Sequence, residues 1–401
     1  LGFSNDAIDA IKNAISFDTS AKVTRNTQLD EDINNLNSLV LQELDNSLLI
    51  PESQEELNDG EKDTIEFEVD IPGYKLDTAS TISCSYLYRN YTKMDDILFE
   101  ALDIIICAFA VVDENGNLSG STKSFFNNVK QYILPKAKEN GVYVLLSLAP
   151  GSKWTEFTNP SNNVVDKAVD NSIAIMEEYG FDGIDIDWER PKSGQETWFT
   201  NFAKKLNVKL KQKNPNYLLT AAIGAGKWQP PSYDLPNSEK YLDYVNVMSY
   251  GMETSSRHYQ NALYKSSHST TSCSIDETVS IYENLKVARS KLIFGLAFYG
   301  IRQDYVDGAW VKKGSVLYNA LLESYLNEGN TEYEVFYDDI AQVPYIMNKG
   351  KTIFISYDNE RSIKVKCQYV IDNNIGGVMA WEAGCDLSGS LLRAVKEGLN
   401  K

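Results

Sequence analysis

The sequence is poor in the residues that build metal sites, disulfide frameworks and histidine-based catalytic centres. It contains only two histidines, His258 and His268, and five scattered cysteines without a C-x-x-C pair. Both histidines lie in a Ser/Thr-rich stretch without metal-ligand partners at useful spacing, so we expect them at the surface. An odd, scattered set of cysteines predicts no disulfide framework and no zinc site. With so few histidines, the sequence also does not favour a Ser-His-Asp hydrolase.

Long apolar runs and positive charge are scarce as well. The best candidate for a membrane segment, Ile104–Val112, is far too short to cross a bilayer, so we predict no membrane span. The net charge is -18 at pH 7, and residues 1–70 alone hold 17 Asp or Glu against 4 Lys or Arg. Because phosphate binding needs clustered Lys and Arg, this charge disfavours nucleic acid as a partner.

From about residue 76 onward, short β-rich apolar runs alternate with longer segments of helical period, which indicates βα units around a parallel sheet. Eight such units predict an α/β fold, a (β/α)8 TIM barrel, over residues 76–401. The expected strands are Thr81–Tyr88, Ile104–Val112, Tyr143–Leu148, Gly183–Trp188, Leu218–Ile223, Tyr244–Ser249, Leu292–Phe298 and Gly377–Trp381.

Two segments lie outside this barrel pattern. The stretch between the seventh and eighth strands is too long for one helix, so we expect a small α+β insertion subdomain over 301–357, with two strand-like runs and one helical run. Residues 1–75 form an acidic N-terminal extension of open role, whose alternating run Ile65–Ile71 predicts a half-buried strand.

The segment with the clearest chemistry is Asp182–Glu189. Alternation along a strand places Asp185, Asp187 and Glu189 on one face, which in a barrel points inward at the carboxyl end, where such enzymes carry their active sites. Carboxylates crowded together raise the proton affinity of at least one of them. A carboxylic acid that stays protonated near neutral pH is what cleavage of a glycosidic bond requires.

Neither a solvated edge strand nor a metal site suits these carboxylates as well as acid catalysis does. In an edge strand the acidic residues would not alternate with Ile and Trp in the middle of a barrel pattern. A magnesium site is the second alternative, since carboxylates at barrel strand ends also bind metals. The neighbouring strand ends, Leu148–Pro150 and Met248–Gly251, offer apolar and aromatic groups instead of further ligands, so acid catalysis without metal or cofactor is favoured.

The pattern Asp182-x-x-Asp185-x-Asp187-x-Glu189 resembles the signature of glycoside hydrolase family 18, the chitinase family. The segment Leu292–Gly300 is similar to the seventh strand of that family and Gly376–Glu382 to its eighth. Two strand ends depart from the family pattern. Ala149-Pro150 stands after the third strand where a glycine pair is usual, and Gly251 stands after the sixth strand where an aspartate is usual.

The resemblance implies a role for each of five site residues. Glu189 would be the general acid/base, Asp187 would orient the acetamido group of the substrate, and Asp185 would share a hydrogen bond or a proton with Asp187. Tyr250 would bond the acetamido carbonyl, and Trp381 would form the floor under the sugar that is cut.

Further substrate contacts are expected at or just beyond strand ends, because pyranose rings stack on aromatic faces. For Tyr86 and Phe109 a core position is nearly as plausible, whereas Trp154 and Trp228, on expected loops, favour sugar contact. Trp188, which faces outward by parity, and Trp198, inside a helix, are expected in the core. The complete set of expected substrate-binding residues is Trp381, Met248, Tyr86, Phe109, Trp154 and Trp228.

These observations together predict a secreted or cell-surface, monomeric enzyme that cleaves β-1,4-linked N-acetylglucosamine polymers. Asp187 lies on the same face of the same strand as Glu189, so it is placed to hold the substrate and not to attack it. The resemblance then implies a retaining, substrate-assisted mechanism. Two alternatives stay open: an endo-β-N-acetylglucosaminidase acting on N-glycans or peptidoglycan, and a non-catalytic chitin-binding lectin, which the glycine at position 251 mildly supports.

Overall fold

The computed structural model describes residues 76, 80–117, 123–149, 153–160, 164–252, 257–267 and 273–401. Residues Ile71–Lys401 form one compact unit. The strand expected over Ile65–Ile71, the rest of the acidic extension and His268 lie outside the described residues. Nothing in the described part of the chain is a helix long and apolar enough to cross a membrane.

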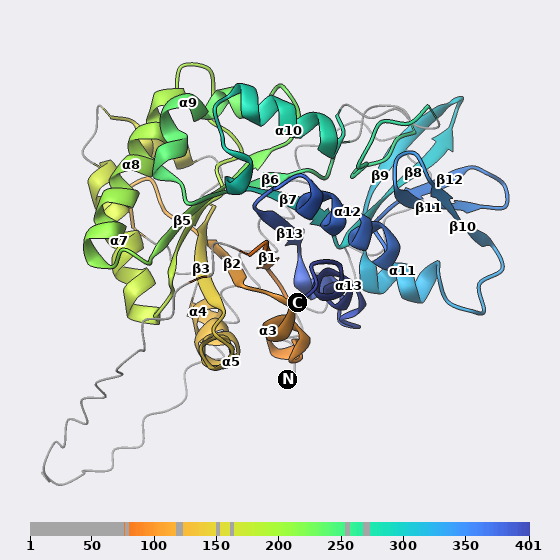
Figure 1. Ribbon diagram of the computed structural model, residues 1–401, viewed down its shortest axis with the longest axis horizontal. Coiled ribbons are helices and arrows are strands. Elements are labelled where there is room, and N and C mark those ends of the chain that lie inside the picture. The colour runs from red at the N-terminus through yellow and green to blue at the C-terminus, as the bar shows by residue number, and fades with distance from the viewer. Residues whose placement is uncertain are drawn as a thin grey trace, which may run out of the picture. The chain divides into compact units, whose positions relative to one another are not determined.

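Within the described residues, eight parallel strands close into a barrel in the order β1-β13-β7-β6-β5-β4-β3-β2, which confirms the predicted (β/α)8 fold (Figure 1). The barrel strands are β1 (Ile82–Leu87), β2 (Ile104–Ala110), β3 (Tyr143–Leu148), β4 (Gly183–Ile186), β5 (Leu218–Gly224), β6 (Tyr244–Met248), β7 (Leu292–Ala297) and β13 (Gly377–Trp381).

Helices between the strands cover the outside of the barrel. They are α3 (Ile97–Ala101), α4 (Lys123–Asn128), α5 (Leu134–Asn140), α6 (Trp154–Thr158), α7 (Val164–Tyr179), α8 (Glu196–Lys213), α9 (Leu235–Ser238), α10 (Ile275–Asn284), α12 (Glu360–Asp372) and α13 (Ser390–Gly398). In α8 the buried residues Phe199, Phe202, Ala203, Leu206 and Leu210 recur at steps of three and four, so one stripe of the helix faces the sheet.

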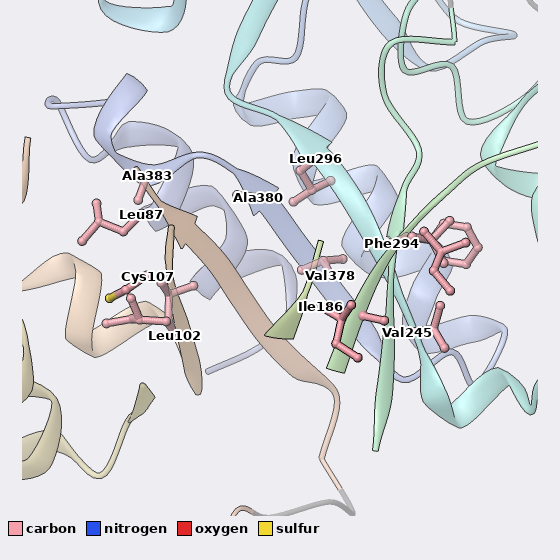
Figure 2. Packing of buried hydrophobic residues seen from close by; sticks show 14 of the residues in the cluster. Leu87, Leu102, Cys107, Ile186, Val245, Phe294, Leu296, Val378, Ala380 and Ala383 are labelled. Carbon is pink, nitrogen blue, oxygen red and sulfur yellow. The ribbon is translucent and has the colours of Figure 1, made fainter. Parts of the chain in front are cut away.

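The strand residues divide into two apolar layers by parity. One set, which includes Ile186, Val245, Phe294 and Val378, packs outward under the helices, and Figure 2 shows part of this layer. The other set fills the inside of the barrel with Ile82, Cys84, Ile104, Ile106, Leu145, Leu218, Ala222 and Met379 among others. All five cysteines are buried, and none of them forms a disulfide within the described part of the chain. The interior of the barrel is therefore a packed core and not a pore.

The predicted α+β insertion between the seventh and eighth barrel strands is present, with more strands than expected. It forms a five-stranded sheet in the order β10-β11-β12-β8-β9, where the sequence indicated only two strand-like runs. Its elements are β8 (Tyr299–Val306), β9 (Ala309–Leu317), α11 (Tyr318–Ser324), β10 (Tyr333–Asp338), β11 (Val343–Asn348) and β12 (Ile353–Ser356) (Figure 1).

The expectation of a surface position for His258 was wrong. His258 is 1% exposed, and its backbone N–H donates to Gln303 Oε1 on β8 at 3.3 Å. The next residues continue this contact, since Gln260 Nε2 donates to the carbonyl of Tyr299 at 2.8 Å. The segment after β6 is thus buried against the inserted sheet, a long-range contact that local composition does not reveal.

Candidate active site

A cavity of about 660 Å³ opens at the carboxyl ends of the barrel strands. Its lining comes from the ends of β1, β2, β4, β5, β6 and β13 and from the first strands of the insertion. The lining residues are Tyr86, Phe109, Ala149, Trp154, Asp187, Glu189, Ala222, Gly224, Gln229, Met248, Tyr250, Gly251, Tyr299, Lys312 and Trp381. Active sites of (β/α)8 enzymes lie at this end of the barrel.

The acidic residues reach the cavity through the alternation of β4. Ile184, Ile186 and Trp188 all belong to the outer apolar layer. The residues between them, Asp185 and Asp187, are both buried at 0% and 8% exposure, and Glu189 follows at the rim, where it is exposed. Side-chain parity on the strand therefore places Asp185 lowest and Glu189 highest along one inward line.

Asp185 is surrounded by hydrogen-bond donors from four strands. Its Oδ2 accepts from Tyr86 Oη at 2.9 Å and from Ser147 Oγ at 2.7 Å. Its Oδ1 accepts from Thr220 Oγ1 at 2.6 Å and from Asn246 Nδ2 at 3.1 Å. Hydrogen bonds of this kind favour a carboxylate, yet burial is the larger effect and raises the pKa of Asp185 above its usual range.

Asp187 has fewer polar partners in a nearly dry position. Its buried Oδ1 has no hydrogen-bond partner among the described residues. Burial raises the pKa of Asp187 well above its usual range, and the negative charges of Glu189 and Asp185 raise it further. An acceptor at the wall of a cavity without a protein partner is a group that a bound ligand satisfies.

Although Glu189 is exposed at the rim, partial desolvation by the surrounding protein raises the pKa of its carboxyl, so this side chain holds its proton to higher pH than a fully solvated glutamate. The sequence suggested repulsion among crowded carboxylates as the reason for a raised proton affinity. In the structure burial is the largest cause of the raised pKa for Asp185, Asp187 and Glu189 alike, and charge repulsion contributes at Asp187.

Trp381 lies at the end of β13 within an aromatic cluster. Its ring stacks on Phe109 at a centroid distance of 5.8 Å and on Tyr88 at 6.2 Å, and lies 5.3 Å from Tyr86. Tyr86 is only 1% exposed and bonds Asp185, so it supports the site from the core, while Phe109 is partly open to the cavity. In the ring of eight strands β13 lies opposite β4, so Trp381 faces the acidic residues across the cavity.

The buried side chain of Glu382 fixes the backbone beside Trp381. Its Oε2 accepts from the backbone N–H groups of Tyr88 at 2.9 Å and Gly384 at 3.1 Å. Arg89 Nε lies 2.9 Å from Glu382 Oε1. These contacts join the ends of β1 and β13, so the aromatic cluster around Trp381 is held by neighbouring strands and not by a loop.

Tyr250 and Met248 come from the end of β6, and both are half-buried in the cavity wall. The Tyr250 ring lies over Gly295, where an added Cβ would come within 2.7 Å of the ring. It also contacts the Tyr299 ring edge-on at 6.0 Å, and its hydroxyl lies 3.8 Å from Met379 Sδ. Gly295 on β7 is thus the reason that a large phenol fits at this strand end.

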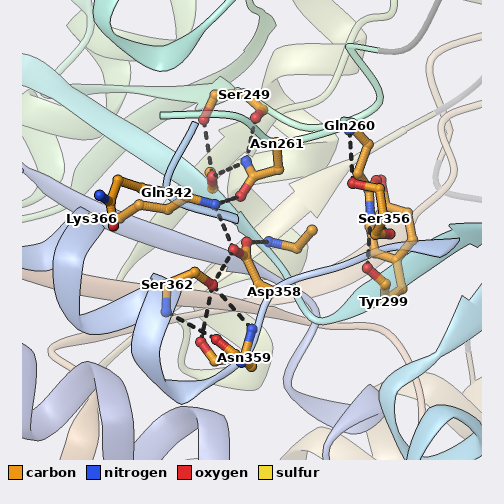
Figure 3. Close-up of polar contacts among 12 residues, drawn as sticks. Ser249, Gln260, Asn261, Tyr299, Gln342, Ser356, Asp358, Asn359, Ser362 and Lys366 are labelled. Carbon is orange, nitrogen blue, oxygen red and sulfur yellow. Dashed lines mark hydrogen bonds and ion pairs between the residues drawn. The ribbon is translucent and has the colours of Figure 1, made fainter. Parts of the chain in front are cut away.

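A buried polar network lies behind Tyr250 (Figure 3). Asn261 donates to the carbonyl oxygens of Ser249 and Gly295, and its own oxygen accepts from the Lys366 ammonium on α12. Lys366 also pairs with Asp358 Oδ1 at 2.5 Å. The network therefore joins helix α12 and the end of the insertion to Ser249, which follows β6 and precedes Tyr250.

Trp154 does not lie on a loop as expected. It belongs to α6, is 1% exposed and stacks on Trp188 at 5.1 Å, and its Nε1–H donates to the carbonyl of Asp187 at 3.2 Å. Trp154 thus contributes to the cavity lining, but its ring is almost fully buried and also supports the acidic strand end. Trp228, by contrast, is 76% exposed beyond β5, with Lys227 Nζ 5.0 Å from its ring centroid, and it is outside the cavity lining.

Sequence reasoning missed several residues of this site. Thr220 and Asn246 occupy inward positions of otherwise apolar strands, a signal that strand parity could have detected. Gln229 and Lys312 also line the cavity. Gln229 lies on a loop and Lys312 on an exposed hairpin, so no sequence pattern identifies them. Gly251 lines the cavity with φ of 64°, a left-handed backbone conformation that favours glycine.

No group of three or more His, Cys, Asp or Glu side chains that could hold a metal ion occurs in the described part of the chain. The cavity instead combines inward carboxylates with an opposite aromatic wall. A closed (β/α)8 barrel with this arrangement at its carboxyl end is that of a barrel glycoside hydrolase. The chain belongs to the glycosyl hydrolases family 18, whose family model matches residues 83–386.

Curated relatives agree with this assignment, and a solved structure shows the same fold. The chain is 24% identical to Chitinase A1 of Niallia circulans, a match that covers 72% of this chain and 47% of that protein. It is 26% identical to Sporulation-specific chitinase 2 of Saccharomyces cerevisiae, covering 69% of this chain and 64% of that protein. The chain thus spans less than two thirds of both relatives. The Group IV chitinase of Ostrinia furnacalis has the same fold, with a TM-score of 0.72, 22% identity and coverage of 80% of this chain and 100% of that chain.

Proposed function

We propose that this chain hydrolyses β-1,4-linked N-acetylglucosamine polymers, chitin or chito-oligosaccharides, with retention of configuration and with the substrate as its own nucleophile. The names of its relatives, Chitinase A1 and Sporulation-specific chitinase 2, support this class of substrate. We also propose that it acts as a monomer outside the cell, where such a polymer is accessible.

The observation that carries the mechanism is the one-sided placement of acid groups. Among the described residues that line the cavity, only Asp187 and Glu189 are acidic, and both come from the end of β4. A retaining glycosidase with an enzymatic nucleophile needs a second carboxylate across the anomeric carbon, about 5–5.5 Å from the acid. The opposite strand provides Trp381 instead, which supports attack by the 2-acetamido oxygen of the sugar itself.

Each side chain then has one part in the reaction. Trp381 stacks under the sugar that is cut, and Glu189, whose pKa burial raises, donates its proton to the glycosidic oxygen. The unpaired Oδ1 of Asp187 accepts the acetamido N–H. The Tyr250 hydroxyl donates to the acetamido carbonyl, so that its oxygen is held beside the anomeric carbon.

After attack, the leaving sugar departs with the Glu189 proton and an oxazolinium intermediate remains. Glu189, now ionised, takes a proton from water as the water attacks the same carbon from the face that the leaving group vacated, which restores the β configuration. Asp187 stabilises the positive charge on the intermediate in a buried position where such interactions are strong. Asp185, held by its four donors, supports Asp187 from below.

Product analysis on four substrates tests this proposal. Chitotetraose should be cleaved to β-configured products, whereas cellotetraose, which has the same linkage and no acetamido group, should not be cleaved. A thiazoline analogue of the intermediate should inhibit. Efficient cellotetraose hydrolysis, or a glycosyl ester trapped on any Asp or Glu, would refute the mechanism. Turnover confined to a high-mannose glycopeptide or to peptidoglycan, or chitotetraose binding without turnover, would refute the substrate class or the enzyme activity.

A further inference from the structure

Strand β5 has an open position where it meets the cavity. Its inward residues are known from their contacts: Thr220 Oγ1 donates to Asp185, and Ala222 belongs to the cluster inside the barrel. Leu219, Ala221 and Ile223 pack outward. By the same parity a side chain at position 224 would point into the cavity mouth, but this residue is glycine.

The amide of Gln229 occupies the place that a side chain at 224 would take. A Cβ built on Gly224 would lie 2.1 Å from Gln229 Oε1, 2.4 Å from its Cδ and 2.8 Å from its Nε2. The glutamine amide thus lies directly against the glycine backbone. Gln229 is half-buried and lines the cavity, so one side of the amide faces the backbone and the other faces the cavity.

The loop that carries Gln229 is tied to the acidic strand end. It continues into a 3-10 helix over Pro230–Tyr233, and the Tyr233 hydroxyl donates to the carbonyl of Trp188 at 2.7 Å. Trp188 directly precedes Glu189 in the chain. At the start of this loop, the Tyr282 hydroxyl donates to the carbonyl of Gly224 at 2.9 Å. Gln229 is therefore positioned by buried contacts and not by an independent surface loop.

This placement puts the amide at the end of the strand next to the one that carries the acid, and both residues line the cavity. Strand β5 pairs with β4, whereas Trp381 lies on the strand opposite β4. The acid must contact the oxygen between the sugar that stacks on Trp381 and the sugar that leaves. A group next to the acid and across from Trp381 is therefore placed toward the leaving sugar.

We propose that Gln229 is a specificity-determining residue that hydrogen-bonds the leaving sugar, and that Gly224 is required because it makes room for the amide. This inference rests on the proposed hydrolysis of N-acetylglucosamine polymers. A carboxamide has two N–H donors and an acceptor oxygen, which suits the hydroxyl and acetamido groups of such a sugar. The leaving group is thereby selected as a sugar rather than as any apolar aglycon.

Two substrates that differ only in the leaving group test this role. Chitotetraose has a sugar as its leaving group, and the 4-nitrophenyl glycoside of N,N′-diacetylchitobiose has an aryl group when the bond to nitrophenol is cut. In Gln229→Ala, kcat/KM on chitotetraose should fall by about 5–100-fold, because a buried hydrogen bond to the substrate is lost. On the aryl glycoside it should change by less than about twofold.

Gly224→Ala provides an independent test, because the three heavy atoms nearest to its added methyl group all belong to the Gln229 amide, which it would displace. It should reproduce the selective loss on chitotetraose while thermal unfolding shows an intact fold. The double variant should be no worse than either single variant, since both remove the same contact.

The wild type on both substrates separates this inference from the proposed function. If the wild type cleaves neither, the proposed function fails and the role of Gln229 fails with it. If it cleaves both and Gln229→Ala weakens both equally, or if the two substitutions act additively, the role of Gln229 is overturned while the proposed function stands.

Discussion

Replacement of Lys366 by methionine should destabilise the barrel strongly through the network behind Tyr250. The Lys366 side chain is 2% exposed and its partner Asp358 is 0% exposed, so neither charge is solvated by bulk water. Methionine preserves the length and the apolar stem of lysine and removes the ammonium group. Among the described residues, Asp358 then retains Ser362 Oγ at 2.6 Å and the backbone N–H of Ala297 at 3.2 Å as donors, and Asn261 loses the Lys366 donor to its oxygen.

The size of the effect follows from the charge that is left behind. Removal of one partner from a buried ion pair typically costs ~3–5 kcal/mol, because the remaining charge is uncompensated. For a cooperative unit of this length, the typical unfolding entropy per residue converts that loss into a fall in Tm of about 4–7 °C. Burial also lowers the pKa of Lys366, so the folded chain binds this proton less tightly than the unfolded chain does.

Differential scanning calorimetry with a matched control tests this. Lys364 lies on the same helix and pairs with Glu397, but the two side chains are 46% and 61% exposed. Lys364→Met should therefore change stability by less than about 1 kcal/mol. Addition of Asp358→Asn to Lys366→Met should restore part of the loss by removal of the stranded charge. If Lys366→Met and Lys364→Met melt alike, the buried pair does not hold this part of the fold as argued.

The remaining predictions concern the catalytic residues and the extension. Asp187→Asn should lower kcat on chitotetraose by at least about 10-fold with little change in binding by isothermal titration, because positioning of the acetamido group is lost; equal losses in both would contradict this role. The alkaline limb of kcat/KM should fall above the ordinary glutamate pKa of 4.5, since burial raises the pKa of Glu189 and the acid works only while protonated; a limb at or below that value would contradict it. Deletion of residues 1–60 should leave kcat on short substrates nearly unchanged, because the family match spans residues 83–386; loss of activity in a truncated protein with native circular dichroism would place residues of the extension in the site.

The barrel and its acidic strand could be predicted from the sequence because they depend on local periodicity. The alternation of Ile184, Asp185, Ile186 and Asp187 identifies the two faces of β4 without knowledge of any other strand. The position of Trp188 in the core followed from the same alternation. Short apolar runs at regular spacing were sufficient for the other strands.

Features that depend on contacts between distant segments could not be predicted in this way. Strand β9 carries exposed charges such as Lys312 and Lys313, so this inserted strand lacks the alternation that identifies a half-buried strand. Trp154 was expected on a loop in contact with sugar, because its stacking on Trp188 arises only in the folded chain. A surface position was expected for His258 because its polar neighbours in sequence gave no indication of the inserted sheet that covers it.

The central claim, that Glu189 is the proton donor, is tested most directly by the rate of chitotetraose hydrolysis in Glu189→Gln. The amide retains the shape of the side chain and has no proton to transfer, so kcat should fall by about 10²–10⁴-fold while the affinity for the oligosaccharide remains near that of the wild type. A variant that keeps more than about a tenth of wild-type kcat on this unactivated substrate would contradict the assignment of Glu189 as the general acid.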